Sequence, residues 1–119
     1  MEDCLARVSH PEYVLLVART GSAAGGFILL HPRGVAGSPY VASIAVEEGR
    51  RGRGLGTALM AAAEQRFAGA RNLFLCVSSF NPRARELYER LGYTVCGELQ
   101  DYVIDGASEC LMRKRLVRA

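Results

Sequence analysis

The sequence lacks tryptophan, closely spaced cysteines and any long hydrophobic run. Its cysteines form no CxxC pair and no close pairing with histidine, so a metal cofactor is not expected. No apolar stretch approaches the roughly 18 residues that a membrane helix needs, and the N-terminus has no signal-peptide layout. We therefore expect a soluble, cytoplasmic protein with no membrane contact. Three cysteines stand in apolar, strand-like runs, where we expect reduced and partly buried thiols: Cys76, Cys96 and Cys110.

The length and composition predict one folded domain. The 119 residues suffice for a single core, so we expect one domain over residues 1–119. Half of the residues are hydrophobic and 23% are charged, which disfavours disorder. The net charge of +3 is mild, and the chain does not interleave aromatic with basic residues. Nucleic-acid binding is therefore not expected.

The segment 41–56, which reads VASIAVEEGRRGRGLG, predicts a strand, a turn and the start of a helix. Glycines in the turn permit positive φ angles and a close approach to the main chain. Successive N–H groups there attract anions, as does a helix N-terminus with about half a positive charge. The pattern fits a phosphate site, and it also fits a plain solvated turn. The residues concerned are Gly52, Gly54 and Gly56, with Arg50, Arg51 and Arg53.

The spacing of the glycines excludes two common nucleotide-binding motifs. A P-loop requires GxxxxGK[ST], and no lysine falls at the required position. A dinucleotide fingerprint requires GxGxxG, whose last glycine would fall on Thr57 or Leu59. The segment fits R-x-x-G-x-G instead, from Arg51 to Gly56.

The segment 81–93 reads NPRARELYERLGY and predicts a second helix. Asn81 suits the N-cap and Pro82 the first helical position, whereas Gly92 suits the end. Its apolar face consists of Ala84, Leu87, Tyr88 and Leu91.

The remaining pattern predicts an α+β fold with a mixed sheet of about six strands and at least two helices. The first helix should begin at Gly54 and end near Gly69. The strand at 73–77 should be buried on both faces and parallel to the strand at 40–46. Prolines and glycines predict a loop at 32–39. The other expected strands are 13–18, 26–31, 93–97 and 109–115, and the expected apolar face of the first helix is Leu55, Leu59, Ala62, Ala63 and Phe67.

The two motifs together resemble the GNAT superfamily of N-acetyltransferases. The second segment matches N-x-x-A-x-x-L-Y-x-x-x-G-[FY] at every defined position and starts 25 residues after Gly56. The resemblance covers about residues 13–116 and implies a splayed central strand pair and acetyl-CoA as co-substrate. It implies direct acetyl transfer to a primary amine, with a non-catalytic acyl-CoA-binding or regulatory domain as the alternative.

The resemblance also implies a role for each matching residue. Tyr88 corresponds to the general acid that protonates the leaving thiolate, and Asn81 to the residue that bonds the pantetheine arm. Backbone groups of Ile44, Ala45 and Val46 would lie along that arm. The pyrophosphate would be held by the amides of Arg51, Gly52, Arg53, Gly54, Leu55 and Gly56, with Thr57 at the helix start.

The acceptor and the base that deprotonates it are not defined by the sequence. Family members that act on lysine often carry a glutamate where this chain has Tyr40. Glu47 and Glu48 lie at the end of the same strand. Two interpretations stay open for them: they reach the site through water, or they are solvated loop charges without a role there. Ser78 and Ser79 are candidates for orienting the amine. Without a strong base, the site favours amines of lower pKa, and peptide N-termini, small-molecule amines, polyamines and aminoglycosides all stay open.

The family usually places a strand and two helices before the hairpin that begins here at Tyr13. Only twelve residues precede Tyr13 in this sequence. The resemblance therefore implies an acceptor side that is open or is completed by a second subunit, and we expect a homodimer.

Overall fold

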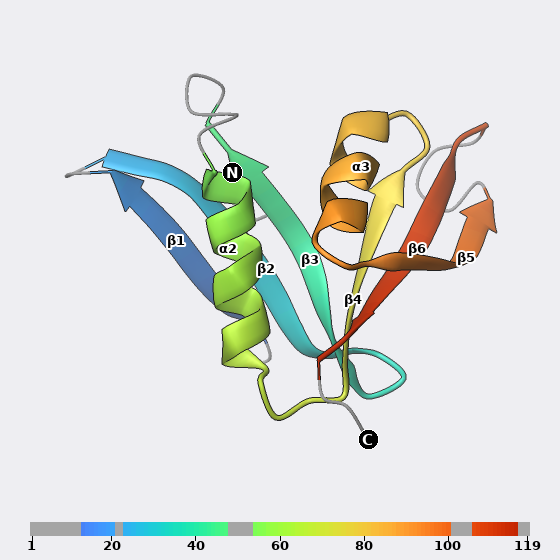
Figure 1. Ribbon diagram of the computed structural model, residues 1–119, viewed down its shortest axis with the longest axis horizontal. Coiled ribbons are helices and arrows are strands. Elements are labelled where there is room, and N and C mark those ends of the chain that lie inside the picture. The colour runs from blue at the N-terminus through green and yellow to red at the C-terminus, as the bar shows by residue number, and fades with distance from the viewer. Residues whose placement is uncertain (1–12, 21–22, 48–53, 101–105, 117–119) are drawn as a thin grey trace.

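The structure is a computed structural model that describes residues 13–20, 23–47, 54–100 and 106–116. Within these residues it contains six strands and two helices (Figure 1). In chain order they are β1 (Val14–Thr20), β2 (Ala23–Val35), β3 (Ser38–Val46), α2 (Leu55–Arg66), β4 (Asn72–Ser78), α3 (Pro82–Arg90), β5 (Thr94–Gln100) and β6 (Ser108–Arg115).

The strands form one mixed sheet in the order β1-β2-β3-β4-β6-β5. The β3–β4 pair is parallel, and every other neighbouring pair is antiparallel. The chain passes through α2 between the two parallel strands, as the strand-helix-strand pattern predicted. The predicted fold class is confirmed, with β6 inserted between β4 and β5.

The predicted loop at 32–39 is wrong, because β2 continues to Val35 and β3 already begins at Ser38. The chain turns at Ala36 and Gly37, whose φ angles are 48° and 80°. The β2–β3 register shifts between His31 and Val35, and Pro32 lies within this irregular stretch. A proline without an N–H is tolerated where the hydrogen-bond ladder is irregular.

Helix α2 packs on the sheet through Leu59, Met60 and Ala63. The predicted face is partly wrong, since Ala62 is exposed and Met60 is fully buried. In the described residues no helix is long and apolar enough to span a membrane.

Strand β4 is buried on only one face, contrary to the prediction. Leu73, Leu75 and Val77 belong to the core that α2 covers, while the alternate residues are only partly buried. Because successive side chains of a strand point to opposite faces, Cys76 and Ser78 lie on the face away from α2.

Helix α3 follows the predicted cap chemistry. Asn81 Oδ1 accepts a hydrogen bond from the Ala84 backbone N–H at 3.1 Å, and Pro82 is the first helical residue. Gly92 follows the helix with a φ of 100°. Tyr88 is buried, and the other predicted apolar positions of the helix are partly buried.

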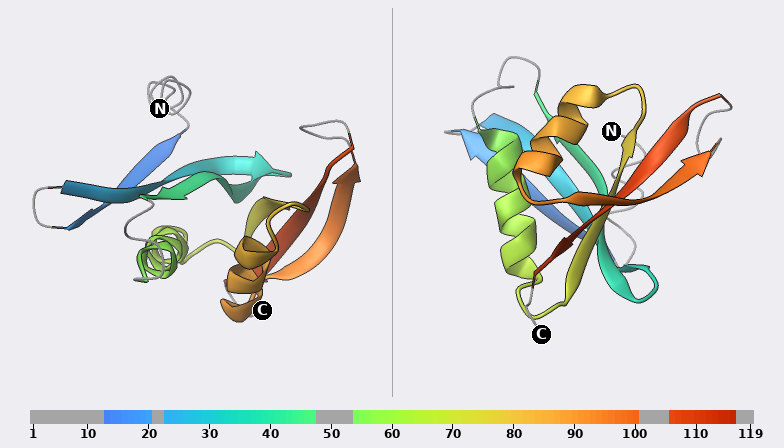
Figure 2. Two further views of the ribbon diagram at one scale, coloured as in Figure 1. Left: turned by 90° about the horizontal axis from the view of Figure 1, so that it is seen from above. Right: turned by 45° about the vertical axis from the view of Figure 1, so that its right-hand side comes forward.

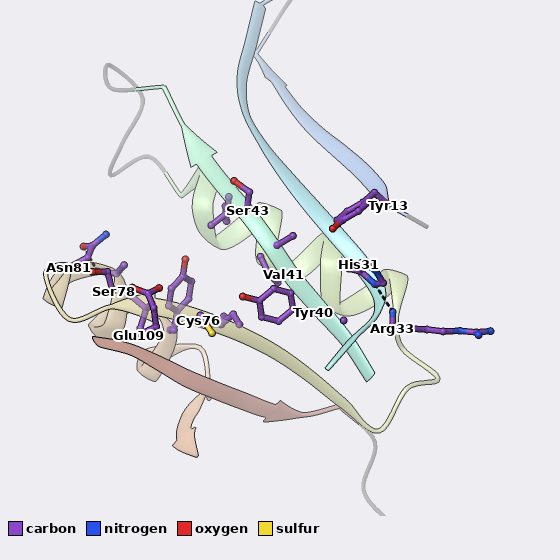
Figure 3. A pocket seen from close by; sticks show the side chains of 17 residues that line it. Tyr13, His31, Arg33, Tyr40, Val41, Ser43, Cys76, Ser78, Asn81 and Glu109 are labelled. Atoms are coloured by element: carbon purple, nitrogen blue, oxygen red, sulfur yellow. Dashed lines mark hydrogen bonds between the residues drawn. The ribbon is translucent and has the colours of Figure 1, made fainter. Parts of the chain in front are cut away.

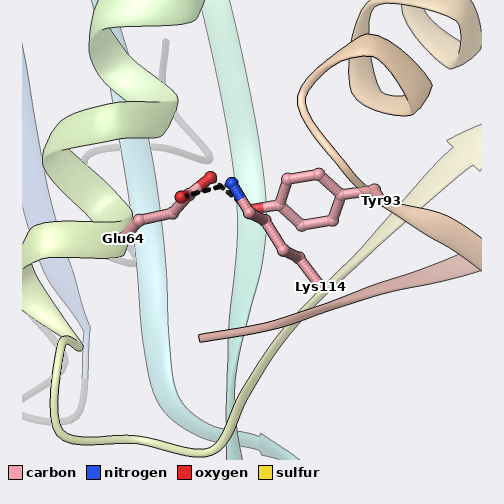
Figure 4. Close-up of polar contacts among 3 residues, drawn as sticks. All are labelled: Glu64, Tyr93 and Lys114. Carbon is pink, nitrogen blue, oxygen red and sulfur yellow. Dashed lines mark hydrogen bonds and ion pairs between the residues drawn. The ribbon is translucent and has the colours of Figure 1, made fainter. Parts of the chain in front are cut away.

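Helix α2 lies on one side of the sheet (Figure 2). On that side a polar cluster joins it to the C-terminal part of the chain (Figure 4). The Tyr93 hydroxyl donates to Glu64 Oε2 at 3.0 Å, and Lys114 Nζ lies 2.8 Å from Glu64 Oε1. Lys114 Nζ also lies 5.8 Å from the centre of the Tyr93 ring. Burial, the Glu64 charge and this hydrogen bond raise the pKa of Tyr93 far above its usual value. The cluster therefore connects the two halves of the sheet across the β3–β4 junction.

Candidate functional site

Strands β3 and β4 are paired at one end only. Tyr40 pairs with Phe74 and Val41 with Leu75, and the pairing ends there. At the same point Ala42 is an extra residue in β3, because Leu30 faces Val41 while Leu29 faces Ser43. Such a bulge bends its strand. Beyond it the two strands diverge, with α3 beside the opening (Figure 1), so the splayed pair expected from the resemblance is present.

A pocket of about 590 Å³ occupies this split (Figure 3). Its lining includes Tyr40 and Ile44 of β3, Cys76 of β4, and Ala84 and Tyr88 of α3. Tyr40 and Cys76 occupy the face away from α2, whereas Tyr88 belongs to the core on the helix side. The pocket therefore reaches through the sheet from one face to the other.

The glycine turn is only partly within the described residues. Arg51, Gly52 and Arg53 lie outside them, as do Glu48 and Arg50.

The end of the turn has the conformation that the sequence predicted for it. Gly54 is the N-cap of α2 with a φ of 79°, and as a glycine it has no side chain with which to cap the helix. The backbone N–H groups in the first turn of α2 are donors of the kind that bind an anion. Leu55 is partly buried and Thr57 is exposed in this first turn.

Gly56 does not use the positive φ angle that a glycine permits, because it already lies within α2. A Cβ atom there would lie 3.7 Å from Leu87 Cδ2, an ordinary contact distance. Neither the backbone conformation nor the available space therefore requires a glycine at this position.

The predicted pantetheine-binding segment is the diverging end of β3. Ile44, Ala45 and Val46 pair with β2, and Ile44 lines the pocket. Strands β2 and β3 are very close here, since a Cβ atom on Gly26 of β2 would lie 2.7 Å from the carbonyl oxygen of Ala45 in β3. Packing against β2 therefore fixes the backbone of this segment.

Asn81 lies at the pocket and also caps α3. The cap uses the side-chain oxygen, and an asparagine amide also carries an NH₂ group with two donors. The capping role and the predicted contact with a ligand are therefore compatible.

Tyr88 also lines the pocket, and its side chain is only 7% exposed. Burial raises the pKa of its phenol, so the hydroxyl stays protonated at neutral pH. No hydrogen bond joins this hydroxyl to any residue that the structure describes. The ring packs edge-on against Tyr93 at a centroid distance of 6.2 Å. Tyr88 therefore brings a protonated phenol to the pocket lining.

The pocket lining also includes residues that the sequence analysis did not assign to the site, chief among them Cys76 and Glu109. Burial raises the pKa of the Cys76 thiol, a hydrogen bond with Tyr40 lowers it, and the charge of Glu109 raises it. Ser78 lines the pocket, where its hydroxyl accepts from the Phe80 N–H at 3.2 Å.

Other sequence expectations fall outside the pocket. Glu47 is exposed and does not line it, and the Ser79 hydroxyl accepts from the Ser108 N–H at 3.3 Å. Of the three cysteines expected to be partly buried, Cys96 is exposed and Cys110 is buried.

Comparison with known proteins identifies the family to which the chain belongs. The sequence profile of the Acetyltransferase (GNAT) family matches residues 2–93, which is most of the chain. The protein belongs to this family, as the two motifs predicted. No curated protein matches the chain at a significant level.

Solved structures show the same fold. An acetyltransferase of the GNAT family from Desulfovibrio desulfuricans has a TM-score of 0.84 and 25% identity, covering 98% of this chain and 78% of that one. The ribosomal-protein-S18-alanine N-acetyltransferase of Escherichia coli has a TM-score of 0.86 and 22% identity, covering 100% and 79%. An aminoglycoside 6'-N-acetyltransferase solved with coenzyme A has a TM-score of 0.83 and 21% identity, covering 99% and 80%.

Proposed function

We propose that this protein is an acetyl-CoA-dependent N-acetyltransferase that transfers acetyl directly to a primary amine. The observation that carries the proposal is the split between β3 and β4, with a pocket through it that is lined by Tyr88. Membership of the acetyltransferase family supports the same activity.

The described residues fit acetyl-CoA. The first turn of α2 follows Gly54, where a Cβ atom would meet no described residue within 4 Å apart from its chain neighbours. This suits a pyrophosphate, which we assign to the amides of residues 51–56 and to Thr57. The diverging end of β3, from Ile44 to Val46, suits the pantetheine arm. Asn81 would donate its side-chain N–H to that arm while Oδ1 caps α3.

The chemistry assigned to the chain is proton donation by Tyr88. Acetyl-CoA, when bound, supplies an acetyl group activated as a thioester. Tyr88 gives its phenolic proton to the sulfur as the C–S bond breaks, and regains a proton from the amine nitrogen that has bonded to the acetyl carbon. A cationic amine releases one further proton to water before it attacks. A positioned acid of this kind typically contributes about 10²- to 10⁴-fold to the rate.

The acceptor is proposed to be a small-molecule amine or a peptide N-terminus. Two of the structural neighbours are named for a ribosomal-protein alanine and for aminoglycosides. An α-amino group with a pKa near 8 is roughly one-tenth deprotonated at pH 7, whereas a lysine-like amine is far less so. The site therefore favours acceptors with the lower amine pKa.

Two further properties stay predictions. Cys76, Cys96 and Cys110 are free thiols, which suits a reducing compartment such as the cytoplasm. We also expect a homodimer, which light scattering at micromolar concentration checks, with a monomer as the contradicting result.

The test is release of free CoA thiol from acetyl-CoA in the presence of alaninamide, benzylamine, spermidine and an aminoglycoside. We expect release that depends on the amine, with the acetylated product identified by mass spectrometry. Binding of acetyl-CoA without transfer to any amine would favour the non-catalytic alternative. Absence of acetyl-CoA binding would overturn the assignment.

A further inference from the structure

Glu109 is the one acidic side chain in the pocket lining that the structure describes. It stands near the start of β6, opposite Ser78 of β4 and Leu99 of β5. In Figure 3, Glu109 lies with Ser78 and Asn81 at one end of the pocket. Its carboxylate is therefore at the end to which α3 contributes, where Tyr88 lines the same pocket.

This carboxylate has no cationic partner among the described residues. The ion pairs there are Arg85–Glu89 and Lys114–Glu64, and Glu109 takes part in neither. Arg33 lines the far end of the pocket, and its side chain points away from the other labelled residues (Figure 3). A partly buried carboxylate is stabilised by a cation that enters its surroundings. Its charge already affects the pocket, because it raises the pKa of the Cys76 thiol.

We propose that Glu109 binds the positive charge of the acceptor, so that this pocket selects amines that are cationic at neutral pH. The inference rests on the proposed function, since it assigns the acceptor to the same split that would hold the acetyl donor. It adds a specificity residue that neither sequence motif contains.

The chemistry of a carboxylate determines how Glu109 interacts with an acceptor amine. A carboxylate accepts charge-assisted hydrogen bonds from an ammonium group, and it still accepts one from the neutral amine. Carboxylates are much weaker bases than alkyl amines, so the proton leaves to water. Glu109 is therefore a positioning residue that selects charge, and anionic acceptors are excluded by repulsion.

The first test compares amines with alcohols of the same shape. Alaninamide and lactamide, benzylamine and benzyl alcohol, and 1,4-diaminobutane and 1,4-butanediol are titrated by calorimetry into the full chain with CoA present. We expect the wild type to prefer at least one amine over its alcohol. Glu109→Gln should lower that preference about tenfold or more, the size of a lost charge-assisted hydrogen bond. Glu109→Asp should retain part of it.

The matched control is Glu98→Gln, which removes the same charge from the neighbouring strand. Glu98 is exposed, pairs with Cys110 on the core face and does not line the pocket. This variant should keep the full preference for amines. Equal amine binding by Glu109→Gln and the wild type would overturn the proposal, as would a wild type that prefers none of the three amines.

A second measurement needs no folded variant and no acceptor. Cys76 lies in the same pocket, and its labelling by a cationic and an anionic methanethiosulfonate reports the local charge. We expect the aminoethyl reagent to label Cys76 faster than the sulfonatoethyl reagent, relative to their rates with free cysteine. Equal or reversed relative rates at Cys76 would contradict the proposal. Neither measurement involves acetyl transfer, so a charge-selective pocket without acetyl-CoA binding would refute the proposed function alone.

Discussion

Tyr88 and Tyr93 are neighbouring tyrosines with different surroundings. Their rings meet edge-on at 6.2 Å, with an interplanar angle of 68°. Both are buried, and burial raises the pKa of both phenols. The Tyr93 hydroxyl bonds to Glu64, while the Tyr88 side chain lines the pocket between β3 and β4.

The difference lies in what the hydroxyl contacts. The Tyr93 phenol completes a cluster that connects α2 with β6, so its oxygen contributes to stability. The Tyr88 phenol has no partner among the described residues, so its oxygen is available to a ligand. Removing the same oxygen atom from each residue should therefore give opposite results.

The largest effect is expected for Tyr88→Phe. The proposed proton donor is lost, so kcat for acetyl transfer should fall about 10²- to 10⁴-fold. The free energy of unfolding should change by no more than about 0.5 kcal/mol, because no hydrogen bond is lost. Steady-state kinetics and urea unfolding measure the two quantities. Unchanged kcat would remove the catalytic role of Tyr88.

Tyr93→Phe is the matched substitution. It deprives Glu64 of a hydrogen bond, and a bond to a charged group contributes roughly 1.5 to 3 kcal/mol. We expect unfolding to cost about 1.5 kcal/mol less, with kcat within about twofold of the wild type. A loss of activity comparable to that of Tyr88→Phe would abolish the distinction between the two tyrosines.

The raised pKa values of both tyrosines predict loss of stability in alkali. The unfolded chain releases phenolic protons near pH 10, while the folded chain retains them, so the stabilisation is complete below pH 10. Above it, the free energy of unfolding should fall by up to about 1.4 kcal/mol per pH unit for each tyrosine. Urea unfolding between about pH 9 and 12 measures the slope. Each Tyr→Phe variant should reduce it, and an unchanged slope in the double variant would contradict the assignment.

The smallest effect is expected at the start of α3, the helix that carries Tyr88. Asn81→Ala removes the N-cap bond to Ala84 and should cost about 1 kcal/mol of stability. Asn81→Asp keeps a capping oxygen but loses the amide donors, so it should restore stability without restoring acetyl-CoA affinity. Calorimetry and urea unfolding separate the two roles. Full affinity in Asn81→Asp would limit Asn81 to capping.

Local chemistry explains which parts of the fold could be predicted from the sequence. Asn81, Pro82 and Gly92 determine the ends of α3 within a short segment, and the structure has those ends. The loop at 32–39 was predicted wrongly because Pro32 lies in an irregular part of a strand, which depends on the register with β3. The exposure of Ala62 and the burial of Met60 likewise depend on how α2 lies on the sheet.

The site was predictable only where a motif defines it. Tyr88 and Asn81 belong to one continuous segment, and both line the pocket. Glu109 comes to the pocket because β6 pairs with β4, an arrangement that depends on long-range pairing. A lone glutamate near the start of an apolar strand was the only signal in the sequence.

The most direct test of the central claim is a calorimetric titration of acetyl-CoA into the wild-type protein and into Tyr88→Phe. We expect one saturable site per chain in both proteins, with transfer to an added amine greatly reduced in the variant. Absence of binding to the wild type would contradict the claim that the split between β3 and β4 is an acetyl-CoA site.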